Sequence, residues 1–146
     1  MFKRFFIICL TFLCFLSGCV SKNDIGYLDK YEINMKKVSL KISYFEREDY
    51  DSNWIRIKIE VTNKMDEHCN VKISNYYLYS KEDNCKYESI LINTLGDIVS
   101  DEFTLFRSSR NYILVLPFHV QRKVNEDNYY FAVKINNEKY KFYLKG

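Results

Sequence analysis

Hydrophobic and polar residues alternate with a period of two along much of the chain after residue 37. Ile55–Val61 shows this most clearly, because aliphatic residues occupy the odd positions and charged residues lie between them. Successive side chains of a β-strand point to opposite faces, so the alternation predicts a strand with one buried face. The same pattern predicts further strands over residues 38–45, 70–79, 85–92, 112–120, 129–135 and 140–144, and it is ambiguous over 98–106.

Three irregular features refine this pattern. The alternation changes phase near Asn75, which predicts a β-bulge or a break in that strand. Pro117 interrupts a hydrophobic segment and has no N–H to donate, so an edge position or a bulge is expected there. Asn136 and Asn137 tolerate positive φ between two alternating segments, which predicts a hairpin. About seven or eight short strands with no long helical period predict an all-β sandwich or barrel.

The first 18 residues have a different pattern. Lys3 and Arg4 precede a hydrophobic run from Phe5 to Leu16, and small residues follow it. This order is typical of a secretory signal peptide. The run is too short for a helix that spans a membrane, which needs about 20 hydrophobic residues. We therefore interpret residues 1–18 as a signal that is removed after export.

The end of this segment, Leu16-Ser17-Gly18-Cys19, resembles the lipobox of bacterial lipoproteins at all four positions. The resemblance implies cleavage between Gly18 and Cys19 and a diacylglycerol on the sulfur of Cys19. It places the protein on the cell membrane or the outer membrane, facing an extracytoplasmic compartment. The covalent lipid is the only added group that we expect. Residues 19–36 would then hold the lipid and a polar tether, and 37–146 would form the β-sandwich domain.

A second resemblance concerns the strand pattern of that domain. Ile57–Asn63, which alternates and then ends in Thr-Asn, resembles a strand of the immunoglobulin-like domains found in many small bacterial lipoproteins. Ile113–Val120 and the tyrosine-rich final hairpin resemble their closing strands. The resemblance implies an immunoglobulin-like antiparallel β-sandwich of about seven strands, with a binding, adhesive or structural role.

Charge and cysteine content narrow the classes of function. Lys3 and Arg4 are the only charged residues before Cys19, so the rest of the chain carries 20 basic and 19 acidic residues. This near-neutral balance gives no indication of nucleic-acid binding. Cys69 and Cys85 remain after the signal, and an even pair in an oxidising compartment predicts a disulfide. Two buried free thiols, or a metal pair with the neighbouring histidine, are the alternatives.

One acidic segment has part of the spacing of a calcium-binding loop. Asp49, Asp51 and Asn53 are spaced like its first three ligands, and Glu60 occupies the twelfth position, that of its last ligand. The sixth position requires glycine for a sharp turn, but Trp54 occupies it. We therefore interpret the segment as a solvated acidic turn and expect no metal site.

The sequence contains no recognisable catalytic motif. His68 and His119 are the only histidines, and no G-x-S-x-G motif positions a nucleophile. If the segment around His68 and Cys69 is extended, their side chains point to opposite faces. We expect that the protein is not an enzyme and that it has no catalytic residues.

Tyrosines cluster near the predicted disulfide, and such residues are common at protein interfaces because each has a large hydrophobic ring with a polar tip. Tyr76, Tyr77, Tyr79 and Tyr87 are therefore the candidate interface residues. The sequence predicts a membrane-anchored, non-catalytic binding or structural module whose ligand or protein partner is unknown. The alternative is an envelope-anchored inhibitor or immunity protein that blocks an enzyme or toxin.

Overall fold

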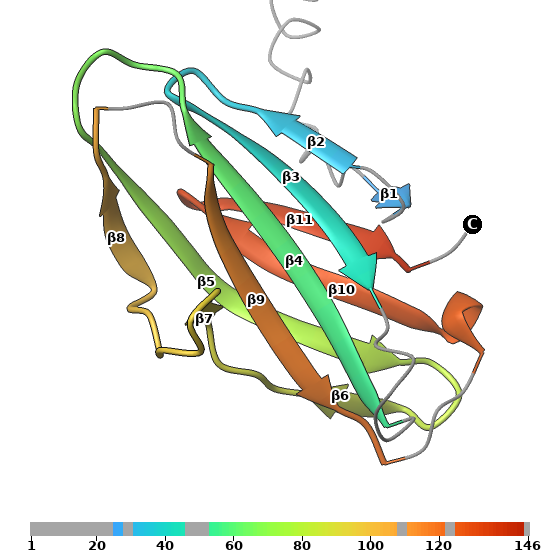
Figure 1. The fold of residues 1–146 in the computed structure, drawn as a ribbon. Helices are drawn as coiled ribbons and strands as arrows, with labels where there is room; N and C mark the ends of the chain where they lie inside the picture. Colours follow the sequence, from blue (N-terminus) through green and yellow to red (C-terminus); the bar gives the residue numbers. More distant parts are fainter. Residues whose placement is uncertain (1–24, 28–30, 46–52, 108–110, 122–124, 145–146) are drawn as a thin grey trace, which may run out of the picture.

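The computed structural model describes residues 25–27, 31–45, 53–107, 111–121 and 125–144. The predicted signal peptide, Gly18 and Cys19 lie outside the described residues. The described chain folds into two β-sheets, which Figure 1 shows one behind the other. Within these ranges, no helix has the length and hydrophobicity needed to cross a bilayer. The predicted all-β sandwich is confirmed.

Sheet A contains six of the described strands. Their order is β1-β11-β10-β5-β6, and β8 pairs with the beginning of β5. The bounds are β1 Ile25–Tyr27, β5 Cys69–Ser80, β6 Cys85–Tyr87, β8 Glu102–Leu105, β10 Tyr129–Ile135 and β11 Glu138–Tyr143.

Sheet B contains five described strands in the order β2-β3-β4-β9-β7. The bounds are β2 Tyr31–Asn34, β3 Val38–Phe45, β4 Trp54–Asn63, β7 Ile92–Asn93 and β9 Tyr112–His119. A short 3-10 helix, Glu126–Asn128, precedes β10. The described residues thus form more strands than the sequence pattern predicts, because several are only two to four residues long.

The hydrophobic core lies between the two sheets and follows the predicted alternation. In β4, every second residue from Ile55 to Asn63 is buried. Phe118 of β9 and Phe131 of β10 meet across the sandwich, with their ring centroids 6.1 Å apart. The largest fully buried side chains are Tyr129, Phe118, Phe131, Phe142, Leu40, Ile42, Ile55, Ile57, Ile59, Ile73 and Leu78.

The predicted bulge and hairpin are both present. Asn75 has a φ of 50°, and the register between β5 and β10 shifts so that Asn75 and Tyr76 face only Val133. This extra residue restores the inward phase of the second half of β5. Asn136 and Asn137 have φ values of 46° and 75° and connect β10 to β11.

Pro117 lies at a position of β9 where the lack of an N–H leaves no hydrogen bond between strands unmade. It pairs with Arg56 of β4 on one side, whereas the edge strand β7 pairs only with Leu114 and Val115 of β9. No neighbouring strand therefore needs a donor from Pro117 on its outer side. Its carbonyl oxygen instead accepts a hydrogen bond from the hydroxyl of Ser89.

The chain enters the sandwich earlier than residue 37. Residues 25–34, which the sequence pattern places in the tether, include β1 and β2. β1 pairs in parallel with β11 in sheet A, and β2 pairs with β3 in sheet B. The N-terminal segment therefore contributes a strand to each sheet.

Candidate binding surface

The outward face of sheet A is rich in tyrosine and lysine. Along β10 and β11 the inward residues are buried, so the intervening residues face outward. In the described strands β5, β6, β10 and β11, the only acidic residue is Glu138, which is exposed at the beginning of β11. We define the tyrosine–lysine surface as Tyr77, Tyr79, Tyr130, Tyr143, Lys81, Lys86, Lys134, Lys139 and Lys141.

Tyr130 lies at the centre of the four rings. Its ring stacks on Tyr79 at a centroid distance of 4.9 Å and meets Tyr77 and Tyr143 edge-on at 6.3 Å and 6.2 Å. Burial among these rings, together with the neighbouring Tyr77 and Tyr79 hydroxyls, raises the pKa of Tyr130. Its hydroxyl is therefore neutral at physiological pH and does not offset the lysine charges.

Lysine ammonium groups lie over the faces of these rings. The Nζ of Lys141 is 3.9 Å from the centroid of Tyr130, that of Lys81 is 4.0 Å from Tyr143, and that of Lys86 is 4.7 Å from Tyr77. Cation–π attraction favours this arrangement and holds the long side chains in place. The rings thus present an ordered set of positive charges at the surface.

A hollow of about 600 Å³ lies beside the rings. Lys134, Lys139, Lys141 and Lys86 line it together with two acidic residues, which are Glu88 and Asp101. The carboxylate of Glu88 is 3.7 Å from Lys86, and both side chains are exposed. Asp101 accepts a hydrogen bond from Tyr76. Positive charge therefore predominates in the hollow.

The four tyrosines predicted as an interface divide into two pairs. Tyr77 and Tyr79 belong to the tyrosine–lysine surface. Tyr76 is half-buried against the core, and its hydroxyl donates to Asp101 at 2.9 Å. Burial, followed by the hydrogen bond to Asp101, raises its pKa to about 12. Tyr87 is buried in the core, and burial raises its pKa.

The interface residues predicted from the sequence include none of the five lysines of this surface and neither Tyr130 nor Tyr143. The alternation that assigns Phe131 and Phe142 to the core also assigns Lys134 and Lys141 to the outer face. That signal was available in the sequence. The sequence does not show that β5 and β10 are neighbours, which completes the surface, because this depends on the strand order.

The predicted disulfide between Cys69 and Cys85 does not form. Both thiols are free among the described cysteines. Cys69 begins β5, whereas Cys85 pairs with Ser80 at the other end of that strand. A strand of this length separates the two by roughly 35 Å, far beyond the about 4.4–6.8 Å that a disulfide requires between Cα atoms.

We expect the two free thiols to react at very different rates. Cys69 is buried, and burial raises its pKa, whereas Cys85 is half-buried. In folded, non-reduced protein, iodoacetamide should label the Cys85 peptide at least about tenfold faster than the Cys69 peptide. Peptide mass spectrometry measures both rates. Failure of both peptides to react after denaturation without reductant would contradict the assignment of free thiols.

The two histidines lie far apart. His68 directly precedes β5, and its Nδ1 accepts a hydrogen bond from the backbone of Arg107 at 3.1 Å. His119 pairs with Trp54 at the beginning of β4, at the other end of the sandwich. No group of three metal-ligating side chains occurs within the described ranges. Asp49 and Asp51 of the acidic segment lie outside those ranges.

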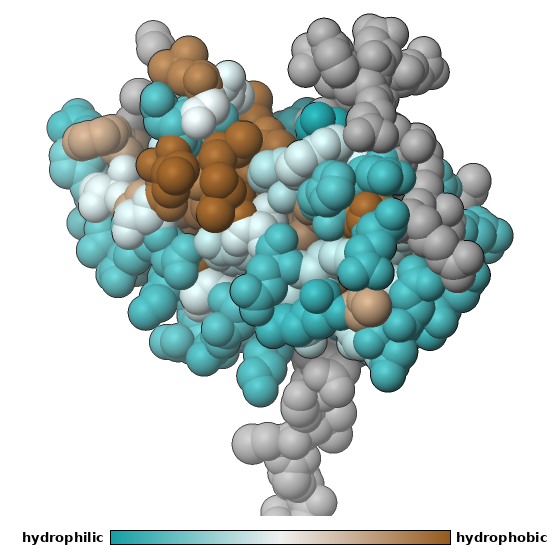
Figure 2. All heavy atoms as spheres, turned by 90° about the horizontal axis from the view of Figure 1, so that it is seen from below, coloured by the Kyte–Doolittle hydropathy of each residue, from teal (hydrophilic) through white to brown (hydrophobic). Residues whose placement is uncertain are grey.

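A hydrophobic patch covers part of the connection between β6 and β8. Ile90, Leu95 and Ile98 are exposed there by 50%, 85% and 74%, and Phe106 after β8 is exposed by 71%. Figure 2 shows hydrophobic residues gathered on the left, the side on which Figure 1 places β7 and β8. We call Ile90, Leu95 and Ile98 the loop patch; Phe106 lies at the far end of β8, where its ring packs against His68.

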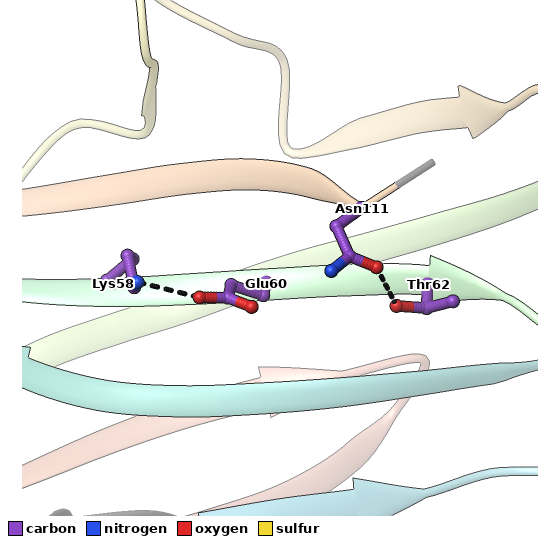
Figure 3. Close-up of polar contacts among 4 residues, drawn as sticks. All are labelled: Lys58, Glu60, Thr62 and Asn111. Carbon is purple, nitrogen blue, oxygen red and sulfur yellow. Dashed lines mark hydrogen bonds and ion pairs between the residues drawn. The ribbon is translucent and has the colours of Figure 1, made fainter. Parts of the chain in front are cut away.

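The outer face of sheet B has mixed charge. Figure 3 shows Lys58 and Glu60 in an ion pair of 2.6 Å and the hydroxyl of Thr62 donating to Asn111 at 2.7 Å. The hydrogen bond from Lys58 lowers the pKa of Glu60. This face therefore carries acidic and basic residues side by side, whereas basic residues predominate on the outward face of sheet A.

Comparison with known proteins gives no family. No protein-family model matches the sequence, and no curated protein matches it. Among solved structures, an uncharacterised β-sandwich protein from Clostridium difficile 630 is similar, with 14% identity and a TM-score of 0.49, over 84% of this chain and 93% of that one. The GAE domain of GGA2p from Saccharomyces cerevisiae has 10% identity and a TM-score of 0.35, over 77% and 90%. We draw no functional conclusion from either.

Proposed function

We propose that this protein is a lipid-anchored, non-catalytic binding module of the cell envelope. The lipobox at Leu16–Cys19, which follows two basic residues and a hydrophobic run, supports the anchor. The tyrosine–lysine surface supports the binding role, because it gathers positive charge and aromatic rings on one face of a nearly neutral domain. An anionic partner fits this surface best.

Metabolic labelling with a palmitate analogue tests the anchor. The wild type should carry the label and sediment with membranes, whereas Cys19→Ala should lose the label and the anchored fraction, because only a thiol forms the thioether. Cys14→Ala is the matched control, since Cys14 lies inside the hydrophobic run, and it should behave as the wild type. A labelled, membrane-bound Cys19→Ala protein would refute the anchor.

The loop patch supports a second candidate function, an envelope-anchored inhibitor or immunity protein. Exposed hydrophobic residues that lie together often mark contacts with another protein. A photocrosslinker at Leu95 should then trap an enzyme or toxin in cells, and Ile98→Asp should abolish the product. Trapping that Ile98→Asp does not affect would count against this function.

A further inference from the structure

The tyrosine–lysine surface lies beside the point where the chain enters the sandwich. Ile25, the first residue of β1, is in register with Lys141 of β11, and Tyr27 is in register with Tyr143. Five residues separate Ile25 from Cys19, so even a fully extended chain reaches only about 20 Å. A lipid on Cys19 would therefore hold this edge of sheet A close to the bilayer.

The chemistry of the surface suits a membrane interface. Tyrosine is enriched at the headgroup level of membranes because its ring is hydrophobic and its hydroxyl is polar. Lysines near a bilayer are attracted to anionic lipids. The central residue Tyr130 touches three other rings, and Lys141 lies directly over it. The surface thus combines both types of residue in one contiguous area.

The acidic residues near this surface are few and lie around it. Glu88 contacts Lys86, and Asp101 holds the hydroxyl of Tyr76. Glu82 lies in the turn after β5, where it accepts a hydrogen bond from Asn128. Glu102 of β8 faces Lys72, which lies outside the surface. On β11, Glu138 is exposed beside Lys139 and accepts a hydrogen bond from the hydroxyl of Tyr140, whereas β10 carries no acidic residue.

We propose that the tyrosine–lysine surface binds the anionic phospholipid headgroups of the membrane that carries the lipid anchor, so that sheet A faces the bilayer and sheet B faces away. This placement rests on the proposed anchor, and it makes the membrane itself the anionic partner. The loop patch and the outer face of sheet B then remain free for other contacts.

Vesicle binding without the lipid tests the surface independently of the anchor. The chain from residue 19 with Cys19→Ser suits this purpose, because every described core residue lies between Ile33 and Leu144. It should bind vesicles of phosphatidylglycerol mixed with phosphatidylcholine, and binding should weaken as salt rises. Pure phosphatidylcholine vesicles should not bind it.

Two triple variants with the same change of charge make the test specific. Each lysine near an anionic bilayer contributes about fivefold in affinity, so replacing Lys134, Lys139 and Lys141 with Gln should weaken vesicle binding roughly 100-fold. The control replaces three exposed lysines of the β2–β3 region, Lys36, Lys37 and Lys41, with Gln and should stay within about threefold of the wild type. Thermal unfolding checks that both variants fold.

Equal weakening in both variants would overturn the proposal, since net charge alone would then explain binding. Absence of vesicle binding by the folded parent chain would also overturn it, as would preferential binding to a soluble polyanion such as a DNA duplex. Because this chain carries no lipid, these results leave the palmitate experiment unaffected, and the two proposals can fail separately.

Amine labelling of the lipidated protein tests the orientation directly. On phosphatidylglycerol vesicles, a membrane-impermeant acylating reagent should modify Lys134, Lys139 and Lys141 several-fold more slowly than in detergent, relative to Lys36 and Lys41. Mass spectrometry of the peptides gives the ratio. A ratio that does not change between vesicles and detergent would contradict the proposed orientation.

Discussion

Replacing Phe131 with Ala should lower the free energy of unfolding by about 4 kcal/mol, the largest effect that we expect from a single substitution in the sandwich. Phe131 is fully buried in β10 and lies at the centre of the contact between the sheets. Its ring meets Phe118 of sheet B at 6.1 Å and lies 6.3 Å from Phe142 on the neighbouring strand. Removing it leaves a cavity that two sheets cannot close without shifting.

Phe106→Ala is the matched control, because the same atoms are removed from a ring that is 71% exposed. Its effect should stay within about 0.5 kcal/mol. Urea unfolding followed by circular dichroism measures both variants. A loss below about 1 kcal/mol for Phe131→Ala would show that the sheets do not pack as described.

Asn63→Leu should lower the free energy of unfolding by about 3 kcal/mol, because it leaves several backbone groups without their hydrogen bonds. Asn63 is the last residue of β4 and is only 5% exposed. Its Nδ2 donates to the carbonyl oxygens of Glu67 at 2.8 Å and Phe106 at 3.2 Å. Its Oδ1 accepts from the backbone N–H of Met65 at 2.9 Å. One side chain thus joins the β4–β5 turn to the segment after β8.

Asn70→Leu provides the control at an exposed position. Its Oδ1 accepts a hydrogen bond from Thr104 at 2.8 Å, but solvent can replace that bond. The change should stay within about 0.5 kcal/mol. If the two variants unfolded at the same urea concentration, the bonds of Asn63 would have no special role in stability.

Most of the strands could be predicted because their alternation is local. Between Ile55 and Val61, the hydrophobic or charged character of each residue indicates whether it faces the core or the solvent. The phase change at Asn75 likewise indicates the bulge without any knowledge of the partner strand. β1 could not be found in this way. Its three residues, Ile25–Tyr27, are too short to show a period, and their partner strand lies more than 100 positions later.

The disulfide prediction failed for a related reason. Sequence separation and redox compartment indicate that Cys69 and Cys85 can pair, but they do not reveal that one long strand holds the thiols at its opposite ends. Of the binding surface, only Tyr77 and Tyr79 were predicted, because the near-neutral total charge conceals how the charges are distributed between two faces. That distribution depends on strand phase and strand order together.

The parallel pairing of β1 with β11 has a mechanical consequence, since every other strand pair in the described chain is antiparallel. The beginning of β1 and the end of β11 point toward opposite ends of this pair. Tension between the N-terminal side of Ile25 and the C-terminal side of Tyr143 therefore loads the connecting hydrogen bonds in shear. These bonds must yield together rather than one after another, so the pair should resist force applied through the two ends of the chain.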